Sequence, residues 1–266
     1  MIILNNKSIH NKIGQWIVVF LMTIVGCEAA PPPPSITSSP GGAVRTTTVV
    51  GAPAHVADAY EEPLVFRSAP GDEQAAGVLV VLHGYNSHPG DLRALSELAI
   101  ARGFRAVLNV PGVVRGGGER RQWERGDVAS TERAIEHALS AYAGDALGPD
   151  ERVWLAGFSQ GGLHASLIAL GRPHRYAGVM ALSPAGFTEV AAPLPILPEA
   201  PDPEFVVTAG RAEPARYART TREVIGLVRT RGITPRVIEH DGGHHLPAGW
   251  QRDLGEVFAQ WSERSK

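Results

Sequence analysis

The sequence predicts one α/β domain in which a mostly parallel central sheet carries helices on both faces. Apolar runs bounded by glycine or polar residues alternate along the chain with segments whose apolar residues recur at helical spacing. Alternation of this kind builds parallel strands joined by crossover helices. The 266 residues are 44% hydrophobic and 20% charged, which suits one globular domain with additional sequence at one end.

The expected elements follow from these runs. We expect strands at residues 46–50, 64–67, 77–82, 104–110, 153–156, 178–182, 205–208 and 236–240. We expect helices after Asp91, near 130–142, after residue 160, at 214–231 and near 251–262. Asp91 is predicted to cap the first of these helices.

Charge and cysteine content exclude several classes of protein. The net charge is −2 and no basic block is present, so nucleic acid is not an expected partner. The single cysteine, Cys27, allows no intramolecular disulfide, and the core must therefore hold the fold together.

The N-terminus has the pattern of an export signal. Lys7 and Lys12 precede an uncharged apolar run of 14 residues, Ile13 to Gly26, which is shorter than the ~20 residues of a membrane-spanning helix. Ile24 to Cys27 resembles a bacterial lipobox, in which cleavage leaves an acylated cysteine as the first residue. We therefore expect an exported, lipid-anchored lipoprotein of the bacterial cell envelope, held at a membrane through Cys27. An ordinary cleaved signal and a fortuitously apolar N-terminus are the alternatives.

Three regions are expected along the chain. Residues 1–26 are the predicted lipoprotein-type signal peptide. Residues 27–43 are rich in proline, serine and glycine and read as a tether. From Val44 the composition becomes that of a folded domain, which is expected to span residues 44–266.

The domain is organised around the sequence Gly157-Phe158-Ser159-Gln160-Gly161. This is a G-x-S-x-G pattern, in which a serine sits on a strained turn between a strand and a helix. The apolar residues before it and the helical pattern after it supply the strand and the helix that this turn requires. Ser159 is therefore the predicted nucleophile.

A serine hydroxyl needs a positioned base and an acid that orients the base. In α/β-hydrolases these groups follow the serine in the order acid, then histidine. His244 is the best base, because Gly242 and Gly243 allow a tight loop just past the last strand, with His245 as its close rival. His164 and His174 are more consistent with packing or surface roles, and His240 ends a strand.

Glu213 is the expected acid. It follows the strand at residues 205–208 and precedes His244, as the order requires. Its alternative role is that of an acidic residue at a helix start. Asp202 precedes the strand and would lie at the wrong sheet edge, and Asp241 is too close in sequence to His244 to orient its ring without an unusual loop. The backbone N–H groups of Gln160 and Tyr85 are expected to form an oxyanion hole.

These motifs resemble one family. Leu82-His83-Gly84-Tyr85, the hexapeptide from Gly157 to Gly162, a lone Trp123 between them, and Gly243-His244 are similar to the phospholipase/carboxylesterase family of α/β-hydrolases, which includes bacterial carboxylesterases and acyl-protein thioesterases. The resemblance covers roughly residues 77–255. At the acid site the chain departs from the family pattern of His-Gly-x-x-Asp.

The resemblance implies an α/β-hydrolase fold, with Ser159 and His244 as nucleophile and base and with Tyr85 and Gln160 as oxyanion donors. It also implies ester or thioester substrates with small or lipid-like acyl groups, and no cofactor or metal. The expected function is therefore a carboxylesterase-type serine hydrolase. A peptidase or acyltransferase on the same fold and a non-catalytic envelope binding protein are the alternatives. The oligomeric state, the acyl length and the natural substrate stay open.

Overall fold

The computed structural model describes residues 60–69, 77–114, 120–143, 147, 153–186 and 203–265. The centre of the domain is built from apolar strands that are buried along their whole length. All residues of β2 (Val78–Leu82) and β3 (Ala106–Val110) are buried, as are nearly all of β6 (Val153–Phe158) and β7 (Tyr176–Leu182). Continuous burial is typical of parallel strands covered on both faces.

These strands belong to a seven-stranded sheet with the order β1-β3-β2-β6-β7-β8-β9. The remaining strands are β1 (Leu64–Arg67), β8 (Glu204–Gly210) and β9 (Arg236–His240). β1 pairs antiparallel with β3 at one edge, and every other pairing is parallel. The parallel strands therefore all end at the same edge of the sheet.

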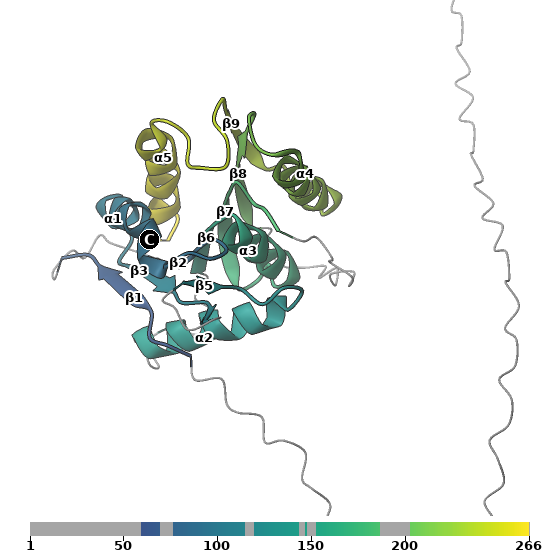
Figure 1. Ribbon diagram of the computed structural model, residues 1–266. Helices are drawn as coiled ribbons and strands as arrows, with labels where there is room; N and C mark the ends of the chain where they lie inside the picture. Colours follow the sequence, from purple (N-terminus) through teal and green to yellow (C-terminus); the bar gives the residue numbers. More distant parts are fainter. Residues whose placement is uncertain are drawn as a thin grey trace, which may run out of the picture. The chain divides into compact units, whose positions relative to one another are not determined.

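Helices cover both faces of the sheet (Figure 1). The helices α1 (Arg93–Ala101) and α5 (Trp250–Glu263) pack on one face, and α2 (Val128–Ala143), α3 (Gln160–Gly171) and α4 (Ala215–Thr230) pack on the other. Trp154 of β6 stacks on Trp261 of α5 with ring centroids 4.5 Å apart. The mostly parallel sheet with helices on both faces confirms the predicted fold class.

Two local features differ from the predictions. Asp91 does not cap α1, whose N-cap is Leu92; instead it lies within a preceding 3-10 helix, η1 (Pro89–Leu92), and accepts a hydrogen bond from the His88 backbone N–H at 2.9 Å. The prediction failed because the turn starts earlier, at His88, whose side chain caps it. The short strands β4 (Val113–Val114) and β5 (Arg121–Gln122), which form a separate antiparallel pair, were not predicted.

The N-terminal predictions lie outside the described residues. These are the signal peptide, Cys27, the tether, the domain boundary at Val44 and the strand at residues 46–50. Each helix that the structure describes is too short or too polar to span a bilayer.

Candidate active site

Ser159 sits at the turn between β6 and α3, in a conformation that side chains rarely adopt. Its φ is 55° and its ψ is −118°, and it is the N-cap residue of α3. A Cβ atom at Gly157 would lie 2.4 Å from the Gly161 carbonyl, and one at Gly161 would lie 2.3 Å from the Leu82 carbonyl oxygen. Both glycines are therefore required by the close approach of backbone, and the turn has the strained geometry that the sequence predicts.

The predicted site residues lie in loops at the edge of the sheet where the parallel strands end. Tyr85 follows β2, Ser159 follows β6, Glu213 follows β8 and His244 follows β9. Functional groups of α/β proteins gather at this edge because each strand delivers its following loop to the same side.

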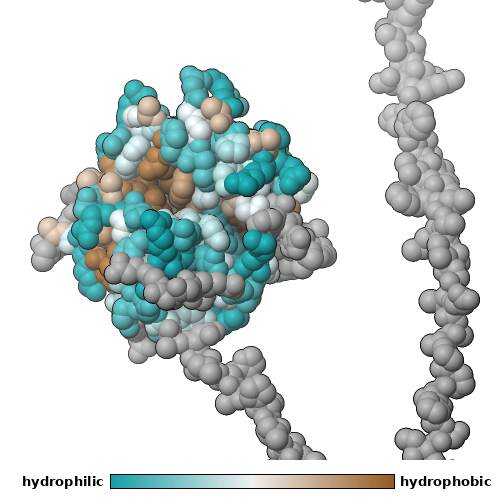
Figure 2. All heavy atoms as spheres, in the orientation of Figure 1, coloured by the Kyte–Doolittle hydropathy of each residue, from teal (hydrophilic) through white to brown (hydrophobic). Residues whose placement is uncertain are grey.

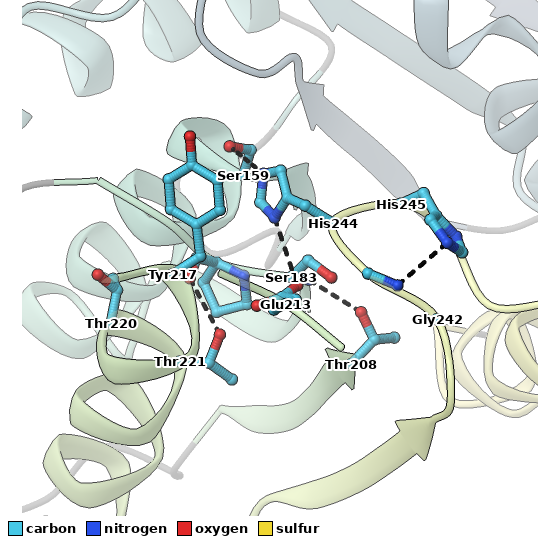
Figure 3. Close-up of polar contacts among 12 residues, drawn as sticks. Ser159, Ser183, Thr208, Glu213, Tyr217, Thr220, Thr221, Gly242, His244 and His245 are labelled. Carbon is cyan, nitrogen blue, oxygen red and sulfur yellow. Dashed lines mark hydrogen bonds and ion pairs between the residues drawn. The ribbon is translucent and has the colours of Figure 1, made fainter. Parts of the chain in front are cut away.

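His244 lies beside Ser159 (Figure 3). Its Nε2 atom is 2.8 Å from the Ser159 Oγ atom, which is a hydrogen-bond distance. The imidazole ring packs against two aromatic rings, with centroid distances of 5.0 Å to Phe158 and 4.4 Å to Tyr217. This packing restricts the orientations that the ring can adopt.

Glu213 lies on the far side of the imidazole. Its Oε1 atom is 3.3 Å from Nδ1 of His244, and its side chain is only 1% exposed. Its other oxygen, Oε2, is buried with no hydrogen-bond partner among the described residues, so His244 is the group that this carboxylate contacts. The N-cap of α4 is Pro214, and no side chain caps that helix. The structure thus brings Ser159, His244 and Glu213 into one chain of polar contacts.

The alternative acids and bases lie elsewhere. Asp241 has a side chain that is 91% exposed and pairs with Arg211 at 2.8 Å. His245 bonds to its own loop, since its Nε2 accepts from the Gly243 N–H at 3.2 Å and its Nδ1 lies 2.8 Å from the Leu246 carbonyl oxygen. Asp202 lies outside the described residues.

Among the described residues, the other candidate histidines form no hydrogen bond to Ser159 either. His240 ends β9 and accepts from the Gly242 N–H, and His174 is exposed in a turn between α3 and β7. His164 is buried in α3, where its Nδ1 lies 2.7 Å from Thr131 Oγ1. Burial lowers the pKa of His164 to about 4, which keeps the ring neutral.

The two proposed oxyanion donors flank Ser159. Gln160 is the first residue of α3, so its N–H is among the helix N-terminal donors that have no partner within the helix. The loop that carries Tyr85 comes close to the serine, because a Cβ atom at Gly84 would lie 3.4 Å from Ser159 Cβ. Tyr85 as a whole is 63% exposed.

His83 orients the backbone before Tyr85. Its Nε2 atom accepts a hydrogen bond from the Gly112 N–H at 3.0 Å, so the proton is on Nδ1, which donates to the Gly84 carbonyl oxygen at 2.8 Å. Burial lowers the pKa of His83 to about 4 and so maintains this neutral form. The sequence indicated no role for this ring, because one of its two partners, the Gly112 N–H, lies in a loop that is distant in sequence.

Apolar surface lies next to these polar groups. Figure 2 shows a hollow with apolar walls on the face in view, beside α5 and the connection from β9. Partly buried apolar side chains that pack on the α5 side of the sheet include Phe158, Leu246 and Trp250. Within the described ranges, no group of three or more His, Cys, Asp or Glu side chains is arranged to hold a metal ion.

No protein-family model matches the sequence, and a search of curated proteins finds no relative. Solved structures do match. A carboxylesterase from Bacillus cereus superposes with a TM-score of 0.60 and 18% identity, over 76% of this chain and 95% of that one. The esterase PE8 gives a TM-score of 0.58 and 21% identity, over 75% of this chain and 98% of that one. A protein of unknown function from Agrobacterium tumefaciens superposes with a TM-score of 0.59 and 19% identity, over 76% of this chain and 97% of that one. Together with the sheet order and the turn at Ser159, these likenesses show that the chain has the α/β-hydrolase fold.

Proposed function

We propose that the chain is a serine hydrolase that cleaves carboxylic esters through an acyl-enzyme on Ser159, with thioesters and lysophospholipids in the same substrate class. The observation that carries the proposal is the chain of contacts from Ser159 Oγ through His244 to Glu213, at 2.8 Å and 3.3 Å. A hydroxyl, an imidazole and a buried carboxylate in this order form the arrangement that activates a serine nucleophile.

The first half of the proposed reaction forms the acyl-enzyme. Ser159 Oγ attacks the ester carbonyl carbon while His244 Nε2 takes the hydroxyl proton, and Glu213 stabilises the imidazolium through Nδ1–H. The negative oxygen of the tetrahedral intermediate accepts hydrogen bonds from the backbone N–H groups of Gln160 and Tyr85. The intermediate then collapses, the ester C–O bond breaks, and His244 returns its proton to the departing alcohol.

The second half repeats these steps with water. A water molecule gives its proton to His244 Nε2 and attacks the acyl carbon, and the new tetrahedral intermediate uses the same two amides. Collapse releases the carboxylic acid, and Ser159 Oγ takes the proton back from His244.

The surroundings of the site support an acyl substrate. Phe158 contacts the His244 ring, and the apolar hollow of Figure 2 lies near the connection that carries His244. An apolar wall beside the nucleophile stabilises a hydrocarbon chain by removing it from water. The structural likeness to proteins described as a carboxylesterase and an esterase supports the same reaction class.

Labelling with a fluorophosphonate tests the proposal. We expect one phosphonyl group per chain, located by peptide mass spectrometry on Ser159, and no labelling of Ser159→Ala. Ser166 provides a matched control, because it is a buried serine of α3 whose hydroxyl donates to the Gly162 carbonyl oxygen. Ser166→Ala should be labelled to the same extent as the unaltered protein. Absence of labelling in the unaltered, folded protein would refute the catalytic proposal.

We also propose that Cys27 carries a lipid that holds the domain at the bacterial cell envelope. The support is the sequence alone, with an apolar run that ends in Ile24-Val25-Gly26-Cys27 and a proline-rich tether after it. Growth with labelled palmitate should label the protein in the membrane fraction, and Cys27→Ser should abolish the label. Equal labelling of both forms would refute this proposal without affecting the catalytic one.

A further inference from the structure

Trp123 bonds to the loop that carries one of the proposed oxyanion donors. The residue follows β5 and is only 2% exposed. Its indole Nε1–H donates to the His83 carbonyl oxygen at 2.7 Å, two residues before Tyr85. The indole also stacks on the His83 ring, with centroids 4.9 Å apart and an interplanar angle of 29°. Trp123 thus contacts both the backbone and the ring of His83.

His83 in turn determines the direction of the Tyr85 amide. The His83 Nδ1–H donates to the Gly84 carbonyl oxygen at 2.8 Å. The peptide unit between Gly84 and Tyr85 is planar and trans, as no cis peptide bond is present in the described residues. Its C=O and N–H groups therefore point in opposite directions. The hydrogen bond that orients the Gly84 carbonyl therefore also orients the Tyr85 N–H.

Trp123 also bonds to the residue that carries the other donor. The Trp123 N–H donates to Gln160 Oε1 at 3.0 Å, and Gln160 Nε2–H donates to the Trp123 carbonyl oxygen at 2.8 Å. This pair of buried bonds joins the side chain of Gln160 to the backbone of Trp123. The backbone N–H of the same Gln160 is the second proposed oxyanion donor.

We propose that Trp123 is a positioning residue that holds the Tyr85 and Gln160 amides at the spacing which the transition-state oxyanion requires. This inference rests on the proposed function, because it assigns Trp123 a part in that reaction. The donors act on charge that develops only in the transition state, so displacing them slows the chemical step and leaves substrate binding nearly unchanged. Loss of a residue that merely filled the core would not lower kcat selectively while leaving substrate binding unchanged.

Replacement of the indole by a smaller ring tests the proposal. Trp123→Phe removes the bond to the His83 carbonyl and retains an aromatic ring. Trp154→Phe is the matched control, because Trp154 is also buried and its Nε1–H donates to Ser265 Oγ at 2.9 Å, on the α5 side of the sheet. Both variants lose one indole hydrogen bond, which is buried at Trp123 and partly buried at Trp154, but only the first loses a bond near the site.

The measurements are kcat and KM for a para-nitrophenyl ester, and the affinity for a trifluoromethyl ketone, which forms a tetrahedral oxyanion on an activated serine. For Trp123→Phe we expect kcat to fall by about tenfold or more, KM to stay within about threefold, and the ketone affinity to fall by the same factor as kcat/KM. Trp154→Phe should match the unaltered protein in all three quantities.

A second variant keeps the test valid if Trp123→Phe does not fold. Gln160→Met introduces a side chain of similar length that lacks the amide group. The backbone N–H at position 160 stays in place. This variant should show the same fall in kcat and in ketone affinity. An active unaltered protein whose Trp123→Phe and Gln160→Met variants keep its kcat and ketone affinity would overturn this inference alone. An unaltered protein that neither hydrolyses esters nor binds the ketone would overturn the proposed function together with it.

Discussion

The Nε2 atom of His244 lies 2.8 Å from the Oγ atom of Ser159, although the two residues are 85 positions apart in the chain. The contact exists because β6 and β9 are parallel strands of one sheet and end at the same edge. It also requires the tight turn at Gly242 and Gly243, which brings the imidazole back over that edge (Figure 3).

The two adjacent histidines should differ sharply in their effect on activity. His244→Ala removes the only imidazole bonded to Ser159 within the described residues, and we expect kcat to fall by about a thousandfold or more. His245→Ala removes bonds to the Gly243 and Leu246 backbone only, and it should keep kcat within about tenfold. Steady-state ester hydrolysis by both purified variants checks this. The reverse order of effects would assign the base to His245.

Glu213→Gln should lower kcat by about a hundredfold or more at nearly constant KM. A carboxamide of the same size fills the space but does not stabilise the imidazolium that forms on His244. Asp241→Asn is the matched control, because this exposed carboxylate pairs with Arg211 and contacts no imidazole of the site. It should change kcat by less than about twofold. Full activity of Glu213→Gln would show that another group orients His244.

Buried histidines should make the fold less stable in mild acid. The pKa of His164 is lowered by burial from 6.5 to about 4, so between these values the unfolded chain binds a proton that the folded chain does not. The effect of His164 on the free energy of unfolding is therefore small above pH 6.5, and that free energy falls as the pH decreases toward 4. For this one residue, the loss between pH 7 and pH 5 is about 2 kcal/mol in the free energy of unfolding.

Urea unfolding of the unaltered protein and of His164→Gln at pH 7 and pH 5 measures this contribution. The variant has no titrating ring at this position, so its stability should fall by about 2 kcal/mol less over the same interval. His83, whose pKa is lowered in the same way, remains in both proteins and contributes equally. Equal losses in the two proteins would mean that His164 is not the source.

Two glycine substitutions should act in opposite directions. Gly161→Ala would place a Cβ atom 2.3 Å from the Leu82 carbonyl oxygen and should cost about 2 kcal/mol or more of stability, together with activity. Gly226→Ala lies in α4, where an added Cβ meets nothing within 4 Å. It should stabilise the protein by roughly 0.5–1 kcal/mol at unchanged activity. Thermal unfolding of both variants distinguishes the two cases.

Much of the fold could be predicted because hydrophobic patterns here follow from burial alone. The predicted strands at residues 77–82 and 104–110 contain β2 (Val78–Leu82) and β3 (Ala106–Val110), which are buried along their whole length. The pair of β4 and β5 escaped prediction because two-residue strands are too short to show a period. Asp91 was misplaced because a 3-10 turn begins at His88, and the sequence around it resembles the start of a longer helix.

The candidate site was predictable where local sequence determines geometry. The turn at Ser159 requires glycines at fixed positions, and the sequence has Gly157 and Gly161 there. The bonds that join Trp123 to His83 and Gln160 were not predicted, because they link three loops whose proximity depends on the folded sheet. The choice between Glu213 and other carboxylates likewise needed the folded arrangement, which places only Glu213 within 3.3 Å of His244 among the described carboxylates.

The most direct test is hydrolysis of para-nitrophenyl esters of increasing acyl length by the purified protein, with Ser159→Ala as the control. We expect the unaltered protein to hydrolyse at least one member of the series and Ser159→Ala, folded to the same extent, to lose that activity. The series would also give the preferred acyl length. Activity that persists in Ser159→Ala, or a folded unaltered protein that hydrolyses none of the esters and fails to react with a fluorophosphonate, would refute a catalytic role for Ser159.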